Sequence, residues 1–336
     1  MKKLAVLTLV AFVLTISLNA QTMDEKNLTD KGSFGQKNLK KAPKKIYIAS
    51  FKTFFQVSAS AVATSTGGRN LGGGSFDGAT RTEMAVAIDG VDEIDFITAV
   101  DGVYQQYKKG LEDQGFEIIT AEEAGKTPFY LEWQRKTGGR ISTSQMKGYV
   151  MAIPTGYEYY IRKENSKGKE KGTFIDRTPE LSGDLDDAIV VDISFVFPAI
   201  DMDTKGGLYS SGSSVSAKVN FRLATAAMDG TAGGNINYTQ VKYIYGDGPG
   251  AGAEAYLINS IKSKVEIPDV FAEKKFKERT SASITPAYYS IVFTEDVKTE
   301  VTHTAKCDAG KYIASTQSLM NQVLNYSLEQ LKDNSR

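Results

Sequence analysis

The most informative segment for the architecture is VDISFVF at residues 191–197, in which every second side chain from Val191 onward is large and apolar. Alternation with period two is typical of a β-strand with one buried face. Residues 215–223 repeat the alternation, and turn residues separate them from a third β-like run at 238–245. These patterns predict long antiparallel strands, with residues 213–245 forming a hairpin.

The first half of the chain indicates helices that alternate with strands. The β-branched and aromatic residues at 46–57 predict a strand, and apolar side chains spaced by three and four residues predict a helix over 91–111. Residues 116–119 predict another strand. Residues 120–123 begin with threonine and end with glutamate, the capping box that starts a second helix near 121–125.

The last third of the chain predicts a helix at 253–261, a strand around 288–293 and a final helix over 315–331 that carries an apolar stripe. Strands and helices in this order predict an α/β fold of the mixed α+β kind. We expect a mixed β-sheet with long antiparallel strands, packed by helices and closed by a C-terminal helix. No linker stands out within residues 46–336, so we expect one elaborated α/β domain there.

The N-terminal residues indicate export. Residues 1–20 contain two lysines, then an apolar run, then small residues, which is the order found in a secretory signal peptide. We expect cleavage after Ala20. The apolar run is too short for a comfortable membrane span. Residues 21–45 are polar and rich in lysine, which predicts a flexible arm. We therefore expect the mature protein in the periplasm, at the periphery of the outer membrane or outside the cell.

Composition excludes several classes of protein. The chain is 41% hydrophobic and 24% charged, which is typical of a globular protein. It has 40 basic and 40 acidic residues, and loss of Lys2 and Lys3 with the leader leaves a net charge near minus two. Such a balance gives no electrostatic reason to bind nucleic acid. A single cysteine and a single histidine exclude a disulfide framework, a multi-cysteine zinc site and an HExxH metalloprotease.

The two residues His303 and Cys307 invite comparison with a thiol protease, in which an imidazole activates a thiol. The residues around them have strand character, and positions four apart on a strand lie about 13 Å from one another. That separation is far beyond hydrogen-bond reach, so we expect structural roles for both residues. No serine triad can be assembled without this histidine.

Two further segments resemble binding loops. Residues 246–252, GDGPGAG, follow a predicted strand and precede a predicted helix, and Gly248, Gly250 and Ala253 fit a relaxed dinucleotide pattern. Pro249 removes a backbone donor, which favours a plain connection. Residues 201–206 resemble the start of a calcium loop, but Lys205 replaces an oxygen ligand, and acidic turn residues between strands explain the segment more simply.

Carboxylates and tyrosines leave a second class of activity open. A glycosidase needs two carboxylates about 5 to 10 Å apart, and the acidic residues at 122–123 and 184–187 could supply them, although sequence does not measure the distance. Tyrosines at 157–160 and 288–289 could stack on sugars. Residues 157–175 also predict a hairpin, for which exposure to solvent is favoured over contact with a membrane. We identify no catalytic residue, no cofactor-binding residue and no metal ligand.

Several local motifs resemble one family. Residues 45–51 look like an opening strand, residues 107–119 look like a helix, a glycine and a strand, and residues 187–191 look like the acidic start of a central strand. In this order they resemble the curli-secretion-channel (CsgG-like) group of bacterial envelope proteins and its relatives with a TolB-amino-terminal-like fold. Residues 221–223, with the turn at 229–233, are similar to its hairpin. The resemblance covers about half the chain and implies an envelope protein that assembles or docks with others. Channel subunits of the group are lipoproteins, whereas no cysteine follows the apolar run here.

The sequence therefore gives two hypotheses of different classes. The first is an exported, non-catalytic cell-envelope protein that mediates protein association or assembly, with a link to secretion. Its partners would be envelope proteins or further copies of the chain, without nucleic acid, and peripheral membrane association stays open. The alternative is a secreted carbohydrate-active hydrolase or glycan-binding protein.

Overall fold

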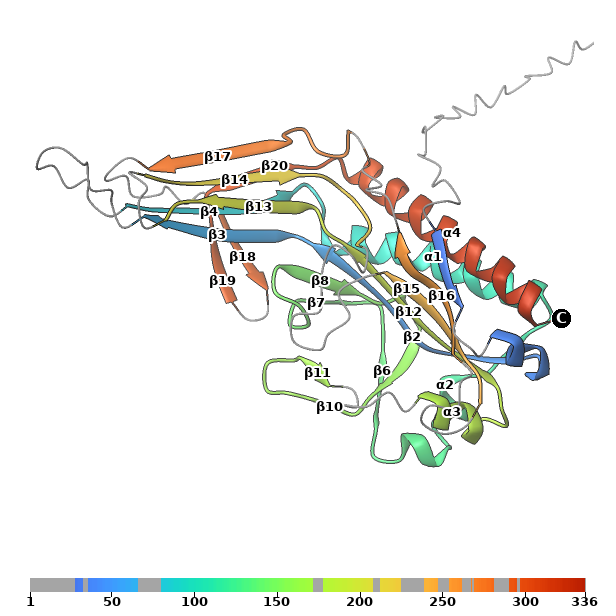
Figure 1. The fold of residues 1–336 in the computed structure, drawn as a ribbon. Helices are drawn as coiled ribbons and strands as arrows, with labels where there is room; N and C mark the ends of the chain where they lie inside the picture. Colours follow the sequence, from blue (N-terminus) through green and yellow to red (C-terminus); the bar gives the residue numbers. More distant parts are fainter. Residues whose placement is uncertain are drawn as a thin grey trace, which may run out of the picture.

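The computed structural model describes residues 28–32, 36–65, 80–171, 178–207, 212–224, 239–246, 254–261, 267, 269–280, 290–294 and 297–335. At its centre is an eight-stranded mixed sheet with the order β1-β16-β15-β12-β2-β8-β7, in which β5 also pairs with β2 (Figure 1). Its strands are β1 (Leu28–Gly32), β2 (Lys45–Gln56), β5 (Glu117–Ile118), β7 (Ile141–Ser142), β8 (Tyr149–Ala152), β12 (Ile189–Phe197), β15 (Gln240–Ile244) and β16 (Glu254–Ile261). The strands predicted at 46–57 and 116–119 are confirmed.

The parallel pair β2 and β12 forms the middle of this sheet, with Phe51 opposite Ile193. The expectation that β12 has one buried face is wrong. Eight of its nine residues are buried, including Ser194, and only Asp192 is partly exposed. Parallel strands in the middle of a sheet are covered on both faces, so alternation along β12 does not separate a core face from a solvent face.

Two long helices cover one face of the central sheet (Figure 1). These are α1 (Glu93–Asp113) and α4 (Ala309–Asn334), which confirm the helices predicted over 91–111 and 315–331 and extend the second. An aspartate precedes each helix. The Asp308 carboxylate accepts a hydrogen bond from the Lys311 backbone N–H at 3.0 Å, which satisfies one of the free amides of the first turn.

A second, smaller core lies against the opposite face. It is covered by α2 (Ala121–Ala124), the 3-10 helix η3 (Pro128–Tyr130) and α3 (Thr178–Asp184). Tyr47 and Val190 of the sheet pack there against Tyr130 and Leu181. The predicted capping box is confirmed, because Thr120 accepts from the Glu123 backbone and the Glu123 carboxylate accepts from the Thr120 N–H at 2.9 Å.

Six strands form a two-sheet arm that extends away from the helices (Figure 1). One sheet has the order β20-β4-β3 and the other β13-β14-β17, and side chains from both meet between them. The strands are β3 (Ser58–Ser65), β4 (Thr80–Asp89), β13 (Ile200–Lys205), β14 (Ser213–Val219), β17 (Lys275–Thr280) and β20 (His303–Lys306). Small and medium side chains fill the interior, among them Ala63, Met84, Val86, Val215 and Ala217.

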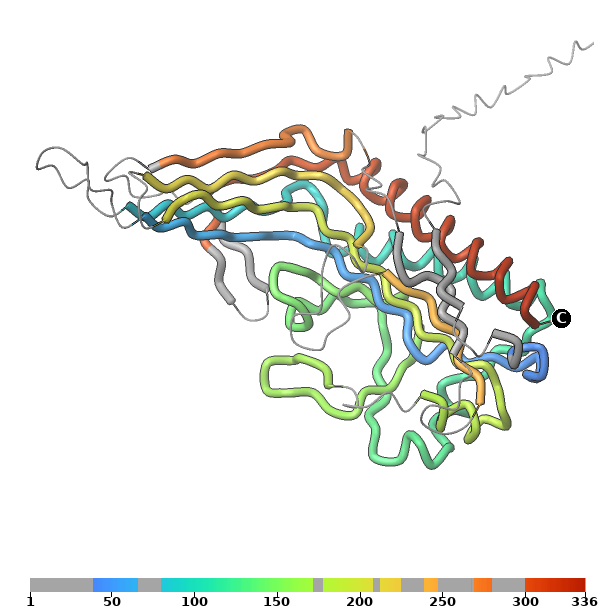
Figure 2. Tube along the Cα trace, viewed as in Figure 1, coloured from blue at the N-terminus to red at the C-terminus, as the bar shows by residue number. Residues whose placement is uncertain are grey.

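The arm is continuous with the central sheet, as the tube in Figure 2 shows for β2 and β3. β2 leads into β3 through Val57, and β12 leads into β13 through Pro198 and Ala199. The buried Gln56 side chain joins the two passages, because its Oε1 accepts hydrogen bonds from the backbone N–H groups of Ala199 and Ile200, each at 2.8 Å. These bonds satisfy backbone donors at the point where pairing within the central sheet ends.

Three short strand pairs complete the described structure. They are β6 (Gln134–Thr137) with β9 (Glu158–Ile161), β10 (Lys163–Glu164) with β11 (Glu170–Lys171), and β18 (Ser290–Thr294) with β19 (Val297–Val301). The predicted hairpin over 157–175 is therefore only partly correct. Its first strand pairs with β6 instead, Tyr157 and Tyr159 are buried rather than exposed, and residues 172–175 lie outside the described residues.

Two predictions in the second half of the chain are wrong. Residues 213–245 do not form a hairpin, because β14 pairs with β13 and β17 in the arm, whereas β15 pairs with β12 and β16 in the central sheet. The helix predicted at 253–261 is the strand β16, which lies between β15 and β1. Pairing with strands that are distant in the sequence determines the secondary structure and the partners of both segments. Local sequence patterns do not contain this information.

The predicted flexible arm at 21–45 contains two defined elements. Residues Leu28–Gly32 form β1 at the edge of the central sheet, and residues Gln36–Lys41 form the 3-10 helix η2, in which Leu39 is buried. The expectation of a free linker is therefore wrong for these residues. The predicted signal peptide at 1–20 lies outside the described residues. Among the helices that the structure describes, none has the length and apolar character required to cross a bilayer.

The mixed sheet packed by helices, with a helix at the end of the chain, confirms the predicted fold class.

Candidate functional site

The structure gives His303 and Cys307 separate partners. The His303 Nε2 lies 3.3 Å from a carboxylate oxygen of Glu278 on β17, and the imidazole packs 5.1 Å from the Phe276 ring. The Cys307 Sγ faces the Asp308 carbonyl at 3.8 Å. Both residues lie along one extended segment, as predicted, and neither is hydrogen-bonded to the other. His303 therefore makes a structural contact between β20 and β17, and Cys307 lies just beyond the end of β20.

The environment of Cys307 also opposes thiolate chemistry. Burial, together with the neighbouring carboxylates of Asp308 and Asp95, raises the pKa of the thiol to about 12. A thiol is nucleophilic only as the thiolate, so the folded protein should present very little of the reactive form at neutral pH.

Alkylation of Cys307 by iodoacetamide at pH 8 should therefore be roughly a hundredfold slower in the folded protein than in free cysteine, whose pKa is about 8.5, because the smaller thiolate fraction outweighs the greater nucleophilicity of a more basic thiolate. Mass spectrometry of quenched samples measures the rate, and unfolding in guanidinium should restore the ordinary rate. Equal rates in the folded and unfolded protein would contradict the prediction.

The acidic segment at 201–206 is not a turn. Residues Ile200–Lys205 form the strand β13, and the Asp201 carboxylate contacts the buried Arg222 guanidinium through two oxygens, at 2.9 Å and 2.5 Å. This bidentate contact occupies the carboxylate with a cation of the chain itself. Within the described ranges, no group of three or more histidine, cysteine, aspartate or glutamate residues is placed to hold a metal ion.

Two of the remaining candidate carboxylates have structural settings, and the glycine-rich segment has a different context from the expected one. Glu123 belongs to the cap of α2, and the Asp184 carboxylate accepts from the Phe129 N–H at 2.9 Å. The glycine-rich segment follows β15 but leads to the strand β16, so the expected strand-to-helix context of a dinucleotide loop is wrong. Residues 247–253 themselves lie outside the described residues.

The tyrosines proposed to stack on sugars are mostly inaccessible. Tyr157 and Tyr159 are each only 4% exposed. Tyr160 stacks on Tyr130, with ring centroids 4.2 Å apart, and its hydroxyl donates to the Ala121 carbonyl. Residues 288–289 lie outside the described part of the chain. Internal packing thus occupies the described members of this set, which counts against the glycan-binding alternative.

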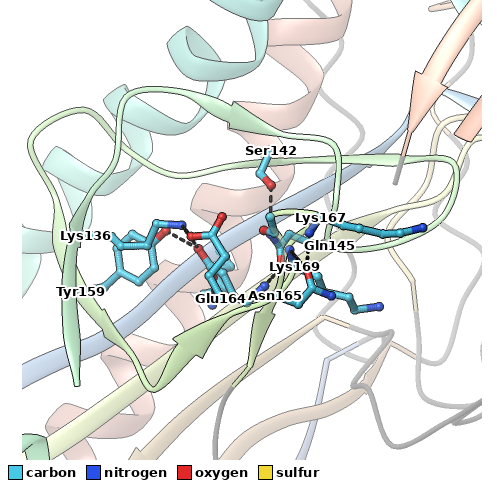
Figure 3. Close-up of polar contacts among 11 residues, drawn as sticks. Lys136, Ser142, Gln145, Tyr159, Glu164, Asn165, Lys167 and Lys169 are labelled. Carbon is cyan, nitrogen blue, oxygen red and sulfur yellow. Dashed lines mark hydrogen bonds and ion pairs between the residues drawn. The ribbon is translucent and has the colours of Figure 1, made fainter. Parts of the chain in front are cut away.

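Among the described residues, Glu170 is the centre of a well-connected set of polar side chains, which we call the Glu170 cluster. The Glu170 side chain is 5% exposed, and its carboxylate contacts the Lys52 ammonium at 2.9 Å, the Lys136 ammonium at 3.2 Å and the Tyr159 hydroxyl at 2.7 Å. Lys136 also reaches Glu164 at 2.8 Å (Figure 3). A buried carboxylate with three donors is satisfied on both oxygens, so the cluster binds the β10–β11 hairpin to β2, β6 and β9.

A second set of contacts fixes the tip of the same hairpin. The Asn165 side-chain oxygen accepts from the backbone N–H groups of Lys167 and Lys169, at 2.9 Å and 2.8 Å, and Gly168 adopts a φ of 80° that favours glycine. Gln145 bridges the tip to the end of β7, because its Nε2 donates to the Gly168 carbonyl and to Ser142 Oγ (Figure 3). The polar groups of the Glu170 cluster therefore bind one another and hold the β10–β11 hairpin in place.

A different kind of surface lies on the outer face of the β13-β14-β17 sheet. Nine side chains project from this face, and cations predominate among them: Asp201, Asp203, Lys205, Ser214, Ser216, Lys218, Lys275, Lys277 and Arg279. All the charged members are exposed. We call this surface the basic face. It is the strongest candidate interaction site of the described chain.

The sequence interpretation missed both the Glu170 cluster and the basic face. A signal for the basic face does exist, because residues 275–279 read KFKER and place a cation at every second position. No such signal marks Glu170, whose partners Lys52 and Lys136 lie far away in the chain.

Comparison with protein-family models, curated proteins and solved structures gives no match to this chain.

Proposed function

We propose that this chain is an exported, non-catalytic cell-envelope protein that associates with other envelope proteins or with further copies of itself, and that the two-sheet arm mediates the association. The predicted leader at residues 1–20 supports export. The separate partners of His303 and Cys307 are consistent with structural roles for these two residues.

The observation that carries the proposal is the arm itself. The two cores of the central sheet are already covered by α1 and α4 on one face and by α2, η3 and α3 on the other. The arm adds six strands that extend beyond the layer covered by these helices, and its interior residues, such as Ala63 and Val215, continue the first core. A projecting element of this kind exposes a large surface, and projecting sheets commonly serve recognition.

The outer face of β3 is the part of the arm that suits contact with another protein. Ser60, Val62 and Thr64 are exposed there, and Val62 is 48% exposed. These three side chains are short and uncharged, and the paired strand β4 places an ion pair beside them, with Glu83 opposite Val62 and Arg81 opposite Thr64. Exposed valine next to small side chains provides an apolar centre for such a contact.

The test is the oligomeric state and the neighbours of the mature protein. We expect an oligomer by light scattering, or envelope proteins cross-linked to the arm in cells, and we expect Val62→Arg to reduce the association at least tenfold. Leu131→Arg is the matched control, because Leu131 is 75% exposed on a different part of the molecule. A strict monomer that cross-links to no envelope protein would overturn the proposal.

A further inference from the structure

The basic face is built by strand register. Three cross-strand rows run over β13, β14 and β17, and their members share the outer face because side chains alternate along each strand. The rows are Asp201–Lys218–Lys275, Asp203–Ser216–Lys277 and Lys205–Ser214–Arg279. Their inward neighbours Val215, Ala217 and Val219 are buried, which confirms the direction of the outer set.

Positive charge on this face is not balanced by the described residues. Five cations stand beside two carboxylates, and Asp201 is already bound to Arg222. Within the described part of the molecule, Lys205, Lys218, Lys275, Lys277 and Arg279 have no ion pair. The whole chain has equal numbers of acidic and basic residues, so this excess is a local feature.

Two of the cations face each other directly. Lys218 on β14 lies opposite Lys275 on β17, on strands about 5 Å apart. Like charges in this arrangement destabilise a sheet. On an exposed face, an uncharged polar residue at either position would avoid this repulsion. The presence of both lysines therefore favours a ligand whose negative charge neutralises them.

The composition of the basic face distinguishes between classes of partner. Its outward residues are Asp, Lys, Ser and Arg, without an apolar side chain. Protein interfaces have an apolar centre and are depleted in lysine, whereas anionic lipid headgroups attract flat arrays of lysine and arginine. The cations on β17 recur about every 7 Å, so they form a regular row of positive charge along the strand.

We infer that the basic face binds the phosphate headgroups of an anionic membrane surface as a peripheral contact. The face lies on β13, β14 and β17, whereas the proposed protein contact lies on β3, so this inference does not depend on the proposed function. Each cation near such a surface is expected to strengthen binding about fivefold, which makes the contact salt-sensitive.

The experiment is co-sedimentation of the mature protein with vesicles of phosphatidylcholine alone or of phosphatidylcholine with phosphatidylglycerol at 3:1. We expect binding only to the anionic vesicles at low salt and its loss at high salt. The double variant Lys275→Glu with Lys277→Glu should weaken binding by roughly a hundredfold or more. The control variant Lys41→Glu with Lys147→Glu changes two exposed lysines elsewhere by the same charge and should bind within about tenfold of the native protein.

Folding of the variant is checked by its melting temperature, which should not fall, because Lys275→Glu replaces a like-charge pair with an opposite-charge pair. Val62→Arg should retain vesicle binding, which separates this inference from the proposed function. Equal binding to neutral vesicles, equal losses in the two double variants, or binding of polyglutamate without binding of anionic vesicles would overturn it.

Discussion

Replacing Phe55 by alanine is expected to destabilise the protein by about 3 to 5 kcal/mol. Phe55 is fully buried and contacts both long helices and a neighbouring strand. Its ring centroid lies 5.0 Å from Phe96 of α1, 5.9 Å from Tyr312 of α4 and 5.3 Å from Phe197 of β12. Truncation would leave a cavity where three elements meet, and none of them can close it without moving away from the others.

Equilibrium unfolding in guanidinium measures this effect. Val62→Ala is the control, because this side chain is half exposed and its truncation should change the free energy of unfolding by less than about 0.5 kcal/mol. A loss below about 1 kcal/mol for Phe55→Ala would show that the site collapses freely, contrary to the packing described.

Replacing Glu170 by alanine is expected to release the β10–β11 hairpin from the sheet, at a cost of about 2 kcal/mol. The change removes the shared acceptor of Lys52, Lys136 and Tyr159. The expected cost is moderate because the two lysines are 26% and 32% exposed and can regain water. Amide hydrogen exchange over residues 163–171 should accelerate, while exchange in α1 should stay unchanged.

The same contact predicts a dependence on pH. Burial alone would raise the pKa of Glu170, but Lys52, Tyr159 and Lys136 together hold it below the usual value. A depressed pKa in the folded state means that the stabilisation is fully present above the unfolded pKa and is lost as pH falls through the folded pKa. Hairpin exchange, corrected for intrinsic rates, should therefore increase in acid below about pH 4.5.

Glu164→Ala is the control for both measurements. Glu164 is 37% exposed and contacts the same lysine, so its loss should cost less than about 1 kcal/mol. Native protection of the hairpin in Glu170→Ala would mean that the Gln145 and Asn165 contacts hold it alone.

Local patterns predicted the elements that depend on local physics. The apolar stripes of α1 and α4 and the cap at Thr120 are properties of neighbouring residues, and all are confirmed. The strand β16 was predicted as a helix because its pairing with β15 and β1 is not encoded in residues 254–261 themselves. The register that places Lys218 opposite Lys275 likewise joins segments nearly 60 positions apart, so the basic face emerges only once the strands are assembled.

The Glu170 cluster was beyond sequence reasoning for a related reason. Among 40 acidic residues, nothing in the immediate neighbours of Glu170 distinguishes it. Its burial depends on β6 and β9 pairing with each other and on β2 passing beside them. Tertiary structure selects one carboxylate from many equivalent candidates.

The bonds from Gln56 to Ala199 and Ile200 have a mechanical consequence. Two strands cross from the central sheet into the arm, and this one amide couples both crossings, which opposes bending between the two parts. A force on the far end of the arm would be transmitted through β2 and β12 to the part of the central sheet that α1 and α4 cover. A partner or surface that binds the arm therefore also fixes the orientation of the rest of the molecule.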